Sequence, residues 1–115
     1  MDLYEIQIPD LFKTPYIIKN HVLNNKTYYF EYTWNNRQGK AYLSIYYLEN
    51  NTKTYILRGL CLKNWIDISN HIFYENWIGK LFFTSYNLDM IDYTPTTIST
   101  DFFLLYRIGE LEVTE

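Results

Sequence analysis

Alternation of side-chain character over residues 27–48 constrains the fold of this chain more than any other feature. The segment reads TYYFEYTWNNRQGKAYLSIYYL, two runs of strand-forming residues on either side of a polar stretch at residues 35–39. Every second side chain in a strand falls on the same face, so each run predicts a strand with one buried face. Two such runs joined by a short Asn- and Gly-containing stretch predict a β-hairpin. One face carries Tyr28, Phe30, Tyr32 and Trp34, then Ala41, Leu43, Ile45 and Tyr47; the other carries Thr27, Tyr29, Glu31 and Thr33, then Tyr42, Ser44, Tyr46 and Leu48.

Other strand signals occur along the chain, because several short runs are rich in β-branched and aromatic residues. Gly59 interrupts one of these runs and predicts a β-bulge or a close backbone approach. Strands at such short intervals predict an all-β fold: a small antiparallel β-barrel or two-sheet sandwich of about five to seven strands, with at most one short helical turn. We expect one domain over residues 1–115. The further predicted strands are residues 3–8, 16–19, 54–58, 80–86 and 102–108, the last of them apolar enough for the middle of a sheet.

Three stretches have a less regular pattern. Residues 64–77 mix helical and loop-like spacing, which predicts a short helix or 3₁₀ turn capped by Ser69 or Asn70. Residues 87–100 are mostly polar and predict a long surface loop. Residues 109–115 are acidic and are expected to fray.

Charge and hydropathy argue against two classes of partner. The formal net charge is -3 and the basic residues are dispersed, so no basic stripe for nucleic acid is present in the sequence. No run approaches the roughly 20 apolar residues that cross a bilayer, and the first ten residues do not resemble a signal peptide. We therefore expect a soluble protein made in a cytoplasm, without nucleic acid or membrane as a partner.

The single cysteine, Cys61, lies in an apolar run and cannot form an intrachain disulfide. We expect it to be a small buried hydrophobic residue. A catalytic thiol would need a neighbouring histidine. His21 and His71 each follow an asparagine and are expected to lie exposed in loops.

Motifs that carry chemistry are missing from the sequence. It has no GxGxxG, P-loop or HExxH pattern and no Cys/His cluster, so it predicts no catalytic residues, no cofactor and no metal. A sugar-cleaving site would need two carboxylates facing each other across a cleft. The acids nearest to aromatic stretches are better explained as loop and turn residues; they are Asp67, Asp89, Asp92 and Asp101.

Residues 26–62 resemble the baseplate plug family of contractile-tailed phages and related prophage tails, of the cyanophage type. The similarity lies in an aromatic strand ending in Trp-Asn, an Arg-containing turn, a strand with a Tyr-Leu-x-Ile core and a Leu-x-Gly-x-x-Leu-like strand. The chain departs from that pattern at Ala41, where the family often has Trp, and at Lys63-Asn64, where it often has Gly. The matching residues are Tyr28, Phe30, Trp34, Asn35, Arg37, Gly39, Tyr42, Leu43, Ile45, Leu57, Gly59 and Leu62, followed by Gly79-Lys80-Leu81-Phe82 and Leu104-Leu105-Tyr106.

This resemblance implies a small β-barrel-like protein in the virion tail tip, synthesised in the bacterial host cytoplasm. It would close the central channel near the hub and spike until contraction, without catalysis. Its partners would be other tail and baseplate proteins, and self-association into a homo-oligomer stays open. Strand edges and loops would make the contacts.

Candidate interface residues are aromatic residues and one arginine, because Trp, Tyr and Arg carry most of the binding energy in interfaces. Arg37 and Tyr46 are expected to be exposed, whereas Trp34 and Tyr42 have the alternative of packing on each other across the hairpin. The candidates are Trp34, Arg37, Tyr42, Tyr46 and Trp65, and the expected structural glycines are Gly39, Gly59 and Gly79.

Two other functions remain open at this stage. A carbohydrate- or receptor-binding β-domain would show two or three coplanar exposed aromatic rings with Asn or Asp beside them. A small enzyme would need two ionisable groups that converge in a cleft.

Overall fold

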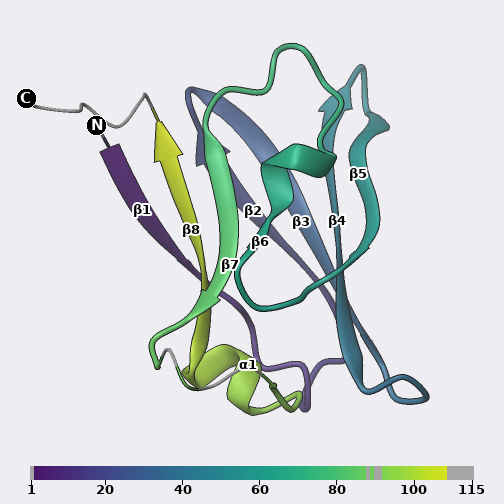
Figure 1. The fold of residues 1–115 in the computed structure, drawn as a ribbon. Helices are drawn as coiled ribbons and strands as arrows, with labels where there is room; N and C mark the ends of the chain where they lie inside the picture. The colour runs from purple at the N-terminus through teal and green to yellow at the C-terminus, as the bar shows by residue number, and fades with distance from the viewer. Residues whose placement is uncertain (1, 88, 90–91, 109–115) are drawn as a thin grey trace, which may run out of the picture.

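Two four-stranded antiparallel sheets face each other across a shared core (Figure 1). The computed structural model describes residues 2–87, 89 and 92–108. The sheets are not closed into a barrel, so the sandwich is the correct alternative. In the described residues the elements are β1 (Asp2–Gln7), β2 (Tyr16–Leu23), β3 (Lys26–Asn35), β4 (Lys40–Glu49), β5 (Thr52–Cys61), β6 (Ile66–Asp67), the 3₁₀ turn η1 (Ile68–His71), β7 (Lys80–Ser85), α1 (Thr97–Thr100) and β8 (Phe102–Ile108).

The first sheet, which we name the meander sheet, has the order β2-β3-β4-β5. The predicted hairpin of residues 27–48 forms its centre as β3 and β4, with Trp34 opposite Ala41. Two-residue turns join the outer strands β2 and β5 to this central hairpin. Asn24 and Asn25 have φ values of 52° and 65°, and Asn50 and Asn51 have values of 52° and 63°. Asparagine tolerates this left-handed region, and two such residues in a row make the turn that matches strand twist.

The second sheet, which we name the composite sheet, has the order β1-β8-β7-β6. β1 pairs with β8 from Asp2 opposite Ile108 to Gln7 opposite Phe103. β8 lies between β1 and β7, which confirms its predicted place inside a sheet. This sheet thus pairs the first described strand of the chain with the last.

The core lies between the inner faces of the sheets and is rich in aromatic rings. Phe83 stacks on Phe102 with ring centroids 5.3 Å apart, and Tyr93 meets both rings edge-on. Burial of large apolar side chains is the main stabilising term in such a fold. Fully buried side chains include Phe30, Tyr32, Leu43 and Ile45 of the meander sheet and Leu81, Phe83, Leu104 and Tyr106 of the composite sheet.

The segment at residues 87–100 is not only the surface loop that its polarity predicts. Tyr93 is 8% exposed and Ile98 is fully buried, so both side chains close the end of the core. The residues from Thr97 to Thr100 form the one-turn helix α1, which lies beside the β1–β2 connection at the lower end of Figure 1. The polar composition of this segment gave no sign that Tyr93 and Ile98 would be buried.

Three glycines have positive φ values. Gly59, with φ of 58°, lies where the β4–β5 register shifts, and its N–H donates to Ser44 Oγ at 2.8 Å. This geometry confirms the bulge. Gly79 has φ of 109°, and a Cβ there would lie 2.7 Å from the Arg107 carbonyl oxygen. Gly39 has φ of 64° in the β3–β4 turn.

Several local predictions need correction. Helical turns occur twice rather than at most once, and the described residues hold eight strands, of which β6 has only two residues. Ser69 and Asn70 lie inside η1 and do not cap it. Ser69 instead anchors this turn, since its Oγ donates to Asp67 and accepts the Leu81 N–H at 2.8 Å. The predicted fraying of residues 109–115 lies outside the described residues.

Candidate interface

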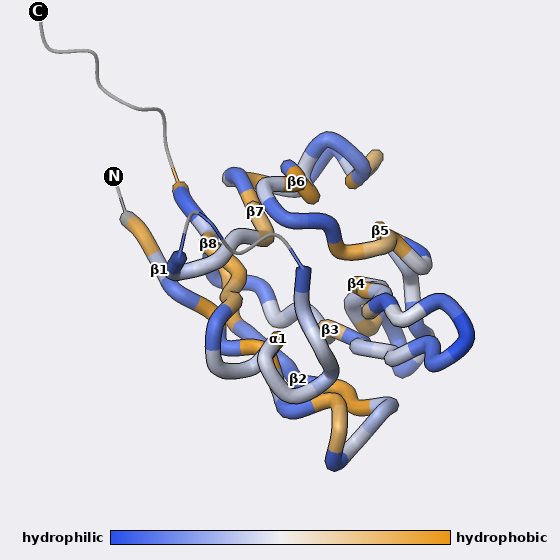
Figure 2. The backbone as a smooth tube through the Cα atoms, turned by 60° about the horizontal axis from the view of Figure 1, so that its bottom comes forward, coloured by the Kyte–Doolittle hydropathy of each residue, from blue (hydrophilic) through white to orange (hydrophobic). Residues whose placement is uncertain are grey.

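The β3–β4 turn brings three of the predicted interface residues to one end of the sandwich. Figure 2 shows this turn as a hydrophilic loop that projects from the molecule. Arg37 lies on it and is exposed, as predicted. Trp34 and Tyr42 flank the turn, but they do not pack on each other, because Trp34 pairs with Ala41 while Tyr42 pairs with Thr33 and faces the opposite side.

Trp34 and Tyr42 are each half-buried, and local contacts hold them. Trp34 meets the Tyr93 ring edge-on at 5.9 Å, and its Nε1 donates to Asn36 Oδ1 at 2.8 Å. The Tyr42 hydroxyl donates to Gln38. These rings therefore brace the turn while leaving one part of each side chain accessible.

Tyr46 lies on the outward face of the meander sheet but is only 5% exposed, so the prediction that it is exposed was wrong. Its ring stacks on Tyr29 with centroids 5.0 Å apart and an interplanar angle of 9°, and the Tyr55 ring lies 5.2 Å away. Lys53 Nζ lies 4.8 Å from its centroid. Neighbours from two strands, β3 and β5, cover this tyrosine, and the alternation within one strand does not reveal them.

A carboxylate organises the same outward face. Glu31 Oε2 accepts hydrogen bonds from the hydroxyls of Tyr16 at 2.9 Å and Tyr55 at 3.1 Å. The hydrogen bond to Glu31 raises the pKa of Tyr16, and burial followed by the same carboxylate raises the pKa of Tyr55. Tyr46 and Tyr29 stack face to face, so this cluster does not present the open coplanar rings that a sugar platform needs.

Trp65 is the most accessible of the predicted aromatic residues, with 57% of its surface exposed. Its φ of 66° is unusual for a bulky residue, and its N–H donates to the Phe83 carbonyl at 2.7 Å. Strained backbone often marks a functional position. Trp65 is one of the candidate interface residues predicted from the sequence, but no sequence signal shows its strained backbone.

A lysine held between two tyrosines was missed by sequence reasoning. Lys26 Nζ donates to the Tyr74 hydroxyl at 2.6 Å and lies 3.8 Å from the Tyr47 ring centroid. The hydrogen bond from Lys26 lowers the pKa of Tyr74. This contact fixes the loop after η1 onto the meander sheet, 48 residues away in sequence.

Tyr93 joins the two layers at the opposite end. Its hydroxyl accepts the Ala41 N–H at 3.0 Å and donates to the Leu62 carbonyl at 2.6 Å. Burial raises the pKa of Tyr93 to about 12. Both partners belong to the ends of the β4–β5 ladder, so this one side chain ties residues 92–96 to the meander sheet.

The two histidines and the cysteine lie in different settings in the described structure. His21 lies in β2 rather than in a loop, with its ring edge-on to Phe30 at 4.9 Å, and burial lowers its pKa. His71 is exposed, as predicted. Cys61 is half-buried on the outward face opposite Tyr42, rather than fully buried.

The acids that the sequence singled out have separate local roles. Asp67 accepts a hydrogen bond from Ser69 Oγ at 2.7 Å, and Asp92 lies 3.8 Å from Lys40 Nζ. The Asp101 carbonyl accepts the Tyr86 N–H, and Asp89 is exposed. Within the described ranges, no three His, Cys, Asp or Glu side chains are grouped as a metal site would require.

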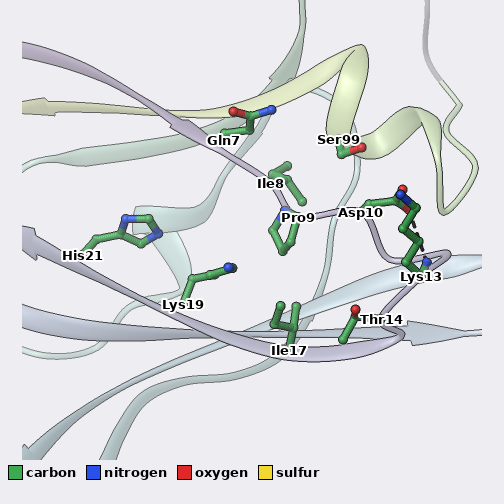
Figure 3. A pocket seen from close by; sticks show the side chains of 10 residues that line it. All are labelled: Gln7, Ile8, Pro9, Asp10, Lys13, Thr14, Ile17, Lys19, His21 and Ser99. Atoms are coloured by element: carbon green, nitrogen blue, oxygen red, sulfur yellow. Dashed lines mark hydrogen bonds between the residues drawn. The ribbon is translucent and has the colours of Figure 1, made fainter.

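Two surface grooves run along the open edges of the sandwich. One of about 540 Å³ lies between the end of β1 and β2, where Lys19 and His21 point toward Gln7 and Pro9 (Figure 3). The other, of about 630 Å³, follows β5 and is closed on its far side by residues 71, 73 and 74. No helix in the described part of the chain has the length and hydropathy to span a membrane.

Comparison with known proteins agrees with the resemblance seen in the sequence. The family described as cyanophage baseplate Pam3 plug gp18 matches residues 3–109. Neither the curated proteins nor the solved structures that were compared gave a match. The matched range contains both sheets and all five predicted interface residues. The chain therefore belongs to the cyanophage baseplate plug gp18 family, a family of phage baseplate components.

Proposed function

We propose that this chain is a non-catalytic structural protein that closes the central channel of a phage or prophage tail, near the hub and spike. The family match over residues 3–109 carries this proposal. A plug needs a rigid body and adhesive surfaces rather than a reaction centre. Two sheets tied together by Tyr93 and Lys26 supply the rigid body.

The accessible residues of the candidate interface support contacts with neighbouring baseplate proteins. Arg37 projects from the β3–β4 turn, and Trp65 is exposed at the start of β6. Trp and Arg are enriched among residues that dominate binding energy. Trp34 and Tyr42 would add contact area around the turn, while Tyr46 would support the sheet from within its tyrosine cluster.

Mass spectrometry of purified intact tail particles, followed by cross-linking, tests the proposal. We expect the chain at a low, fixed number of copies per particle, cross-linked to hub or spike proteins. Its absence from particles, or cross-links confined to the outer baseplate, would contradict the channel-closing role.

A variant at Trp65 separates binding from folding. Trp65→Gly removes the side chain and relieves the backbone at φ of 66°, so thermal stability should stay equal or rise by up to about 1 kcal/mol. We expect this variant to bind less well to tail particles that lack the wild-type chain. Phe73→Gly is the matched control, because Phe73 is 92% exposed and is not among the predicted contacts.

A further inference from the structure

β2 is an outer strand of the meander sheet and has no strand on its far side among the described residues. It pairs with β3 over its whole length without a register shift. β5, the other outer strand of this sheet, shifts register at two places and carries Lys53 and Arg58. Bulges and cations protect a sheet edge against pairing with another chain. The long, regular edge of β2 is therefore the better template for a further strand.

The backbone of β2 is available for such pairing. The turn after β2 places Leu23 opposite Lys26, and antiparallel pairs then alternate between bonded and non-bonded. Ile18, Asn20 and Val22 fall on the non-bonded pairs, so their N–H and C=O groups point away from β3. An incoming strand would bond to these groups.

The side chains of β2 are arranged as a palindrome around Asn20. Moving outward from Asn20 in either direction, the strand has first a basic side chain or an imidazole and then two apolar side chains. An isologous two-fold interface needs a self-complementary surface of this kind, because each residue meets its opposite number in the second copy. The two arms are Lys19, Ile18 and Ile17 on one side and His21, Val22 and Leu23 on the other.

We propose that two copies of the chain pair antiparallel through β2, with the two-fold axis at Asn20, so that their meander sheets form one continuous sheet. Ile18 then lies opposite Val22 of the second copy on the outward face, and the two Asn20 side chains meet at the axis. Val22 is 69% exposed in the single chain. The pairing therefore removes apolar surface from water as well as filling the free backbone groups.

The charge of β2 selects this register. Lys19 is the one Asp, Glu, Lys or Arg residue of the strand, and an axis at Asn20 places it opposite His21 of the second copy. Burial and the neighbouring Lys19 lower the pKa of His21, so the imidazole is uncharged at neutral pH. An axis at Lys19 instead would set two lysines directly opposite each other, which is destabilising. Lys19 keeps its contact with water, because it is exposed beside the groove near Pro9 (Figure 3).

Sedimentation velocity of the purified chain tests this inference, which does not depend on the plugging role. We expect a monomer–dimer equilibrium without larger species, because a two-fold interface closes on itself. Ile18→Lys and Val22→Glu should each lower the association constant about tenfold or more, since each sets a charge opposite an apolar side chain at two places in the dimer. An equimolar mixture of the two variants should restore association. In the mixed dimer the introduced lysine meets the introduced glutamate, and the native Ile18 and Val22 meet at the other pair.

Thr27→Glu is the matched control and should leave association unchanged. Thr27 is exposed and lies opposite Val22 on β3, one strand inside the edge. Circular dichroism verifies that each variant is folded, and Val22→Glu alone suffices if the Ile18 variant is not. A wild-type chain that stays monomeric, species larger than a dimer, an equal loss in the control, or a mixture that does not recover would each overturn the proposal.

Discussion

The two sheets of this protein each contain four strands in the described residues, but they are assembled by opposite routes. The meander sheet is built from consecutive strands, and two of its turns contain only two residues. The composite sheet pairs β1 with β8, so Asp2 lies opposite Ile108. Turn chemistry can set register in the first sheet. In the second sheet, register depends on core packing and on anchors such as Tyr93. One all-β fold can therefore fix the strand register of its two sheets in two different ways.

Gly79 is the position where we expect the largest effect. A Cβ there would meet the Arg107 carbonyl oxygen and the Tyr106 hydroxyl, each at 2.7 Å, and φ is 109°. Gly79→Ala should lower the free energy of unfolding by about 3 kcal/mol. Gly59→Ala in the meander sheet, with open space around it, should cost only about 1 kcal/mol. Urea denaturation of both variants checks this; equal losses would remove the distinction between the sheets.

Tyr93→Phe should have the next largest effect. It leaves the Ala41 N–H and the Leu62 carbonyl without their shared hydroxyl partner, and both lie in a buried setting. We expect a loss of about 2 kcal/mol in thermal unfolding. Tyr86→Phe, which removes an exposed hydrogen bond to Glu5, should cost under about 1 kcal/mol. A loss at Tyr86 as large as that at Tyr93 would contradict the tie between the layers.

Alkaline pH should weaken the fold through Tyr93 and a second tyrosine, Tyr28. Burial raises the pKa of Tyr28 and Tyr93 to about 12, against 10.0 in an exposed tyrosine. Between pH 10 and 12 the unfolded chain has lost protons that the folded chain keeps, so the free energy of unfolding falls as pH rises. Denaturation midpoints at pH 9, 10 and 11 measure this fall. Tyr93→Phe should make it shallower, and an unchanged slope would exclude Tyr93 as a contributor.

The smallest effect concerns the turns of the meander sheet. Asn51→Gly places the most permissive residue at φ of 63° and should raise stability by about 0.5 kcal/mol. Asn36→Gly is the control, because Asn36 lies in the β3–β4 turn without a positive φ. Glycine there enlarges the freedom of the unfolded chain and removes the Asn36 Oδ1 acceptor of the Trp34 Nε1 hydrogen bond, so it should lower stability. Thermal melts that rank Asn36→Gly above Asn51→Gly would argue against turn control of register.

Sequence reasoning succeeded where contacts are local. The hairpin of β3 and β4, the bulge at Gly59 and the central strand β8 all follow from alternation, an isolated glycine or an apolar run. It failed for Tyr93 and Ile98, because their polar neighbours give no sign that these two side chains enter the core. It also failed for His21, whose neighbour Asn20 resembles a loop residue but lies in β2.

In the candidate interface too, sequence reasoning succeeded for local features and failed for features that depend on distant residues. Exposure of Arg37 follows from its place in a polar turn, whereas burial of Tyr46 depends on rings from β3 and β5 that no single strand encodes. The family resemblance came from the order of structural residues and was confirmed over residues 3–109. The β5 groove needs the distant loop after η1, so it was not visible in the sequence.

Pairing of β1 with β8 has a consequence for how the protein is made. A ribosome adds roughly 5–20 residues per second, so β1 emerges several seconds before its partner exists. During that interval the hairpins of the meander sheet can form from neighbouring strands, while Ile6 and Ile8 of the first segment have no layer to join. Synthesis therefore proceeds through a half-built sandwich with an exposed apolar face, and only the last strand to emerge covers it.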